Sequence, residues 1–285
     1  MIARTHMWLG WVMMSCWTSI VYAESQALPV SAVAAISSVQ STNANQTKEI
    51  SIDPEKDYQE GLKILELASS DMTAAVQAAK RFKLAADAGH AGAQAQFALG
   101  LERGQMLDEA IEYYRMSAAQ GHKDGQYGLG SIYMSGEGIP VDFVEARRLL
   151  ALAGAQGHQV AIQTMADAYS RRELSTEEIS ALTRRQEDIY VRSGLGLDAT
   201  ERQSPEALLW IKRAADINYP PALDALAAAY RTGQFGLVVD TNKADEILAQ
   251  ANKERGVAPP VKRKRSGLYK FLRGDDTEKK PEGSK

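Results

Sequence analysis

The stretch from Ala78 to His158 contains one short pattern written three times, and this pattern decides the fold. Each copy has apolar or small residues at relative positions 0, 4, 7 and 8, then a glycine at 11 and a histidine at 12. Residues with this spacing share one face of a helix, so each copy predicts a helix with one buried face. The three copies are Ala78–Phe82–Ala85–Ala86–Gly89–His90, Ala110–Tyr114–Ser117–Ala118–Gly121–His122 and Ala146–Leu150–Ala153–Gly154–Gly157–His158.

The glycine of each copy marks the predicted end of its helix. Glycine readily adopts positive φ, the conformation found just after many helix C-termini. The copies start 32 and 36 residues apart, and a period of this size is typical of repeats built from two helices. The sequence therefore predicts an all-α solenoid of stacked, antiparallel helix pairs.

A second pattern lies between the copies and supplies the first helix of each predicted pair. It is clearest at Leu129-Gly130 and Tyr133, which precede a turn from Ser135 to Asp142 with two glycines, a proline and a capping Asp. In the preceding unit the predicted turn is shorter, from Gly104 to Asp108. The other counterparts are Leu99-Gly100, Met165-Ala166 with Tyr169, and Leu226-Ala227 with Tyr230.

An insertion at about residues 173–203 separates the two helices of the third unit, whose second helix begins only at Ser204-Pro205. Ser175 and Glu178 have the spacing of a capping box, which marks a helix start. We expect one additional helix, closed near Gly194 and Gly196, that lies outside the stack at one edge. Its apolar residues are Ile179, Leu182, Ile189 and Val191.

The first 23 residues have the layout of a secretory signal peptide. Arg4 precedes an apolar stretch from Met7 to Val21, and Val21-Tyr22-Ala23 provides small residues at a cleavage site. An uncleaved N-terminal anchor is the alternative, and lipid attachment at Cys16 is a weaker one. Cys16 is the only cysteine, so the processed chain would have neither a disulfide nor a catalytic thiol.

The remaining segments flank the solenoid, which is predicted over residues 53–256. Residues 24–52 are rich in small polar residues and predict a flexible linker, and Asp53-Pro54 then begins a helix. Residues 257–285 form a predicted basic, largely disordered tail. From Lys262 onward the tail has nine Lys or Arg and four Asp or Glu, a net charge of +5, whereas the whole chain carries −3.

One unit carries the fullest set of these features: Leu129, Gly130, Tyr133, Gly136, Gly138, Ile139, Asp142, Ala146, Ala153 and Gly157. These residues resemble the Sel1-like repeat, a bacterial relative of the tetratricopeptide repeat. The resemblance covers about Tyr58 to Gly256, although one unit has Arg103 in place of the tyrosine and lacks the Gly-x-Gly turn. It implies a right-handed superhelix that acts as a scaffold for protein–protein interactions in the cell envelope.

The three histidines that follow the repeat glycines allow two interpretations. A metal or catalytic array is one, but one histidine per repeat implies a separation of about 8–10 Å, the spacing of packed helices. First-shell ligation requires about 2 Å. We therefore expect turn residues whose rings cap the preceding helix, and we expect no metal, cofactor or catalytic residue. No hydrolase or phosphate-binding motif occurs in the sequence.

Two surfaces are candidates for binding. In tetratricopeptide-like stacks the first helix of each pair lines a concave groove, where a protein or peptide could bind. The groove candidates are Phe97, Tyr127, Ser131, Met134, Gln163, Asp167, Arg171, Asp224 and Arg231. The second candidate is the basic run of the tail, which could bind an anionic polymer or membrane surface: Lys262, Arg263, Lys264 and Arg265.

These observations favour a non-enzymatic exported scaffold, most simply placed in the periplasm. Binding of the envelope through the tail is the alternative, and a cell-wall hydrolase is a weaker one because the repeat phase places the histidines in turns. We expect no nucleic-acid partner, and the net charge of −3 is not in itself strong evidence on this point.

Overall fold

The computed structural model describes residues 53–67, 72–171 and 175–257, and within these ranges it is helical without a β-strand. Ten of the helices form five antiparallel pairs. The pairs are α3 (Pro54–Leu67) with α4 (Met72–Asp87), α5 (Ala91–Arg103) with α6 (Leu107–Ala119), α7 (Lys123–Ser135) with α8 (Phe143–Ala155), α9 (Gln159–Ser170) with α13 (Pro205–Asp216), and α14 (Pro220–Thr232) with α15 (Thr241–Glu254).

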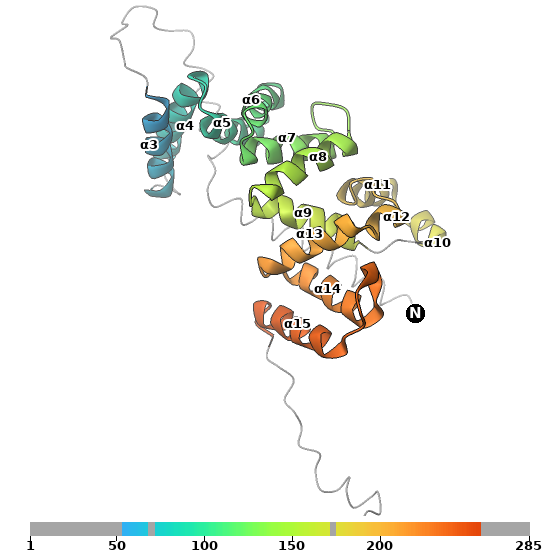
Figure 1. Ribbon diagram of the computed structural model, residues 1–285. Coiled ribbons are helices and arrows are strands. Elements are labelled where there is room, and N and C mark those ends of the chain that lie inside the picture. The colour runs from blue at the N-terminus through green and yellow to red at the C-terminus, as the bar shows by residue number, and fades with distance from the viewer. Residues whose placement is uncertain (1–52, 68–71, 172–174, 258–285) are drawn as a thin grey trace, which may run out of the picture.

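The pairs follow one another in a curved row from α3 and α4 at one end to α14 and α15 at the other (Figure 1). Each helix packs against its partner, and the second helix of a pair packs against the first helix of the next. First helices also touch across pairs, α5 with α7 and α9 with α14. The first helices therefore share one side of the row, which we call the inner face. The predicted all-α solenoid is confirmed.

The repeated pattern forms the core, as predicted. Its residues at positions 0, 4 and 7 are buried in all three copies. Small residues let neighbouring helices approach closely: a Cβ added at Gly128 would lie 2.2 Å from the Tyr114 ring, and one at Gly154 would lie 2.7 Å from Trp210. The predicted positive φ is present at the repeat glycines, for example 93° at Gly89.

The predicted helix starts are largely confirmed, and one turn was misplaced. Asp53 caps α3, and its Oδ1 accepts a hydrogen bond from the Lys56 amide at 3.1 Å. The turn predicted to end at Asp108 is shorter, because α6 already begins at Leu107 and Asp108 lies in its first turn. Gln105 makes this tight connection possible by adopting a φ of 61°.

The insertion contains three short helices, α10 (Thr176–Ser180), α11 (Arg184–Ser193) and α12 (Ala199–Arg202). The predicted capping box is confirmed, with the Ser175 amide donating to Glu178 Oε2 at 2.9 Å and the Glu178 amide donating to Ser175 Oγ at 3.2 Å. The single predicted helix is wrong, because Thr183 forms a second capping box that starts α11 afresh.

The predicted position of the insertion, outside the stack, holds only in part. Ile189 and Val191 are exposed, but Leu195 and Leu197 are buried in the core beside α9 and α13. Arg147 of α8 fixes this end by donating to the Leu195 carbonyl at 2.6 Å.

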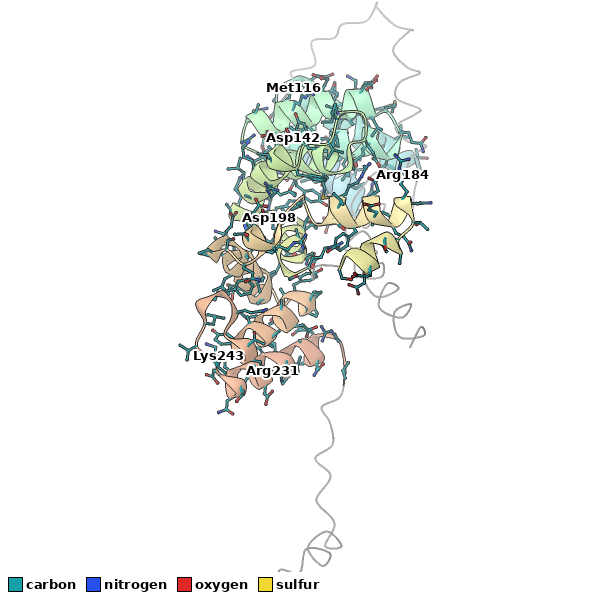
Figure 2. The ribbon with its side chains drawn as sticks, turned by 90° about the vertical axis from the view of Figure 1, so that its right-hand side faces the viewer. Met116, Asp142, Arg184, Asp198, Arg231 and Lys243 are labelled. Carbon is teal, nitrogen blue, oxygen red and sulfur yellow. The ribbon has the colours of Figure 1, made fainter. Side chains whose placement is uncertain are left out.

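The insertion leaves the row at the edge where first helices connect to second helices, which we call the loop edge. Figure 2 looks onto this edge: Asp142 at the start of α8, Asp198 before α12, and Arg231 with Lys243 near the last connection follow one another down the molecule.

Several sequence predictions lie outside the described residues. These are the signal peptide at 1–23, the linker at 24–52 and the tail from residue 258 onward. In the ranges that are described, no helix is long and apolar enough to cross a membrane.

Candidate functional site: the inner face and its histidine edge

The three repeat histidines lie at the starts of first helices, not at the ends of second helices. His90, His122 and His158 are the N-cap residues of α5, α7 and α9. Nδ1 of His90 accepts from the Ala93 amide at 3.0 Å, and Nδ1 of His158 accepts from the Ala161 amide at 3.1 Å. The prediction that these rings cap the preceding helix is wrong, because the chain has already turned at the glycine and the ring lies over the helix that follows.

Two of these rings also contact the first helix of the preceding pair. His90 packs against Tyr58 with ring centroids 4.4 Å apart, and its Nε2–H donates to Glu55 Oε2 at 2.9 Å. His158 stacks on Tyr127 at 4.3 Å, and its Nε2 lies 3.7 Å from Asp124 Oδ1. Each ring therefore links two successive first helices. We call His90, His122 and His158 the histidine edge.

His122 lacks the contacts of the other two. The preceding first helix has Gly92 and Ala95 where α3 has Glu55 and Tyr58. His122 Nδ1 is buried without a hydrogen-bond partner among the described residues. Burial lowers the pKa of His122, and it also lowers the pKa of His158.

The described residues contain no group of three or more His, Cys, Asp or Glu arranged to hold a metal ion. Two rings of the histidine edge, those of His90 and His158, instead join neighbouring repeats, because each binds a helix N-terminus and faces a single carboxylate.

Tyr127, Ser131 and Met134 of α7, and Gln163 of α9, lie half-buried on the inner face. The Tyr127 hydroxyl is hydrogen-bonded with Ser131, and burial raises the pKa of Tyr127. Met134 packs against the core. Gln163 has no side-chain hydrogen bond to another described residue. Ser131, Met134 and Gln163 therefore remain the candidates best able to meet a partner.

Phe97 was predicted to face the groove, and this prediction is wrong. Its side chain is only 3% exposed and belongs to the core. The ring meets Tyr113 of α6 edge-on, with centroids 5.0 Å apart. Because α5 packs against α4, α6 and α7, nearly all of its surface is occupied, and Phe97 lies on the side that faces α6.

Asp167 and Arg171 at the end of α9 already have partners within the protein. Asp167 Oδ2 accepts from the Tyr219 hydroxyl at 2.7 Å, and burial raises the pKa of this carboxyl to about 6. The Arg171 guanidinium lies over the Tyr190 ring at 5.0 Å and donates to the Tyr190 carbonyl at 3.3 Å. Asp167 thus links α9 to α14, and Arg171 holds the insertion.

The two candidates on α14 are also paired. Asp224 forms an ion pair with Arg255, which follows α15. Arg231 forms one with Asp245 of α15 at 2.5 Å. These two ion pairs therefore join α14 to α15 at the C-terminal end of the solenoid. The tail candidates Lys262, Arg263, Lys264 and Arg265 lie outside the described residues.

Sequence reasoning missed the partners of the histidines, although a signal was present. Tyr58 and Tyr127 occupy the same place, five residues after the N-cap of α3 and of α7, and Glu55 and Asp124 both lie two residues after it. A comparison of first helices from their caps would have found these pairs. The Leu-Gly position instead aligns the C-terminal halves of the first helices.

A hollow of about 530 Å³ at the loop edge was also missed. It opens where the connection between α5 and α6 is four residues shorter than the glycine-rich turn between α7 and α8. Leu99, Glu102, Arg103, Gln105, Leu107 and Glu137 line it. The sequence signal for this hollow was the absence of the Gly-x-Gly turn in this unit.

Comparison with known families places four repeats on this chain. A profile described as Sel1 repeat matches residues 93–122, 123–158, 193–219 and 220–251. These matches omit α9, because the insertion separates it from α13, and they omit the first pair, α3 with α4. The packing of α9 against α13 shows that the two still form one pair.

Solved structures give a similar result. A Sel1 repeat protein from Oxalobacter formigenes is 19% identical, with a TM-score of 0.51 over 73% of this chain and 76% of that one. A protective antigen of uropathogenic Escherichia coli with an SLR fold is 24% identical, with a TM-score of 0.41 over 72% and 46%. The similarity to the Oxalobacter protein shows a shared fold.

Proposed function

The chain is a Sel1-like repeat protein, and on that premise we propose that it is a non-enzymatic scaffold that binds a protein or peptide on its inner face. Sel1 repeats generally mediate protein–protein interactions. A stack of helix pairs offers an extended surface on which a partner segment can lie across several repeats.

The observation that carries this proposal is a set of inner-face side chains that helix packing leaves half-exposed. Ser131 and Met134 on α7 and Gln163 on the next first helix remain half-exposed. Met134 offers an adaptable apolar contact. Ser131 and Gln163 offer hydrogen-bonding groups. A short peptide segment crossing α7 and α9 would meet all three.

We further propose that the scaffold is exported and works in the bacterial envelope, most simply the periplasm. The support is the signal-peptide layout of residues 1–23. Intact-mass analysis of the protein from its native host should give a chain that begins at Glu24. A chain that retains residues 1–23 in the membrane fraction would favour the uncleaved anchor.

A crosslinking pull-down from the native envelope tests the binding proposal. Gln163→Lys places a charge on the inner face, and Gln203→Lys is its matched control, because Gln203 is exposed on the insertion. We expect Gln163→Lys to reduce recovery of the partner at least fivefold and the control to leave it unchanged. Equal recovery with both variants would exclude this part of the inner face. Recovery of no protein partner at all would overturn the scaffold proposal.

Tail-mediated binding of an anionic polymer or membrane is the alternative, and the net charge of +5 beyond Val261 favours it. Deletion of residues 262–285 separates the two. Loss of envelope association on deletion would support the tail, and association that survives deletion but is lost in Gln163→Lys would support the inner face.

A further inference from the structure

The helices of this solenoid are capped by two different kinds of group. First helices α5 and α9 are capped by the imidazoles of His90 and His158. Second helices α8, α13 and α15 are capped by the side chains of Asp142, Ser204 and Asp240. Of these caps, only imidazole has an ordinary pKa between pH 5 and 8.

An imidazole that caps a helix through Nδ1 must be neutral. Nδ1 of His158 accepts the Ala161 N–H, so in the neutral ring the proton is on Nε2. Protonation places a second hydrogen on Nδ1, which then opposes the amide hydrogen, and the cap bond is lost. The positive end of the helix dipole also disfavours a cation at this point. The cap bond and the charged ring are therefore mutually exclusive.

The groups around His158 do not remove this conflict. From α7 it faces Lys123, Asp124 and Tyr127, and from the neighbouring N-cap it faces His122. Asp124 favours the charged ring, but its oxygen is 3.7 Å away, which is too long for a direct hydrogen bond. Lys123 and His122 act in the opposite direction, and burial is the largest influence, so the pKa of His158 is lowered.

His122, at the N-cap of the preceding first helix, adds to the effect. It faces Asp124, Lys123 and His90, and burial lowers its pKa as well. Its buried Nδ1 has no partner among the described residues. His90 differs in its contacts, because its Nε2 donates directly to Glu55 Oε2 at 2.9 Å.

We propose that the histidine edge is an acid-sensitive joint: between about pH 7 and pH 5, protonation of His158 and His122 releases the first turn of α9 and loosens its contact with α7. Stability falls as pH falls because the folded form binds fewer protons than the unfolded chain in this window, which begins at the ordinary histidine value of about 6.5. The loosening is a property of the solenoid alone. Its effect on partner binding, through Tyr127 and Ser131 beside the joint, rests on the proposed function.

Amide hydrogen exchange, followed by NMR on the purified protein and corrected for intrinsic exchange, tests the joint. We expect the protection factor of the Ala161 amide to fall at least fivefold from pH 7.5 to pH 5, about the effect of one lost N-cap. The Val144 amide, which Asp142 caps at 3.0 Å, is the internal control and should stay within twofold. An Ala161 protection factor that does not change with pH would overturn the proposal.

His158→Asn separates acid sensitivity from capping, because Asn is a good N-cap that does not titrate. We expect this variant to keep the Ala161 amide protected within twofold across the same pH range. His158→Ala should leave it poorly protected at both pH values, which shows that the cap itself is measured. An acid-induced loss as large in His158→Asn as in the wild type would also overturn the proposal.

Discussion

The junctions before α9 and before α14 use the same repeat position in different ways. At the first, Gly157 turns the chain with a φ of 79° and His158 follows. At the second, Asn218 turns it with a φ of 59° and Tyr219 follows. His158 caps its own helix and stacks on Tyr127 of the preceding first helix. Tyr219 makes no side-chain cap and instead donates its hydroxyl to a carboxylate on the preceding first helix.

The difference gives neighbouring junctions opposite responses to pH. The pKa of His158 is lowered by burial, so acid weakens its junction. Burial raises the pKa of Asp167 from 3.8 to about 6. The folded form then binds its proton more tightly than the unfolded chain, so stability from this carboxyl is present at low pH and is lost as pH rises through about 6. The same positive-φ turn thus occurs at two junctions with different electrostatic contacts.

The largest expected effect comes from Trp210→Ala, which removes the core shared by the two junctions. Trp210 is 3% exposed on α13 and lies against Gly154 of α8, so its truncation leaves a cavity in the core. We expect a loss of about 3–5 kcal/mol in the free energy of unfolding, measured by urea denaturation at pH 7.5. The control is Leu209→Ala, because Leu209 is 47% exposed and should change the value by less than about 1 kcal/mol. Equal effects would mean that Trp210 contributes no more to the core than an exposed leucine does.

The sequence predicted the buried pattern around Trp210 well, because burial of helix faces leaves a periodic signal. Positions such as Ala146, Leu150 and Ala153, which lie in the same core as Trp210, repeat in phase with the other copies of the pattern. A turn glycine with positive φ also has few substitutes. The partner that a polar side chain contacts leaves no such periodic signal in the sequence. The positions of Asp167 and Arg171 in their helix predict exposed side chains. Their partners in the structure are Tyr219 and the insertion, and both are distant in the sequence.

Asp167→Asn tests the second junction alone. The raised pKa predicts that the wild type loses up to about 3 kcal/mol of stability through this carboxyl between pH 4 and pH 7.5. Asn can still accept from the Tyr219 hydroxyl but cannot ionise, so the variant should lack this loss. The measurement is the difference in unfolding free energy between variant and wild type at the two pH values. A difference that does not depend on pH would contradict the assignment.

Tyr219→Phe should have a smaller effect on the same junction. It removes the hydroxyl that donates to Asp167 at 2.7 Å and leaves a largely buried carboxylate with one partner fewer. We expect a loss of about 1–3 kcal/mol at pH 7.5 and a smaller one at pH 5, where the carboxyl is largely protonated. Urea denaturation at both pH values checks this. A loss that grows on acidification would indicate that Tyr219 acts mainly by packing.

The smallest expected effect tests whether the turns of the two junctions are interchangeable. A Cβ at Gly157 would meet nothing within 4 Å, so any penalty there comes from its φ of 79° alone. Gly157→Ala should therefore destabilise by about 1–2 kcal/mol, and Gly157→Asn by less, because Asn tolerates the left-handed region and already holds it at Asn218. Thermal unfolding of the two variants gives the order directly. If Asn proves as costly as Ala, the Asn218 turn depends on its own contact, in which Gln250 Nε2 donates to Asn218 Oδ1 at 2.5 Å, and the two junctions differ in backbone preference as well as in electrostatics.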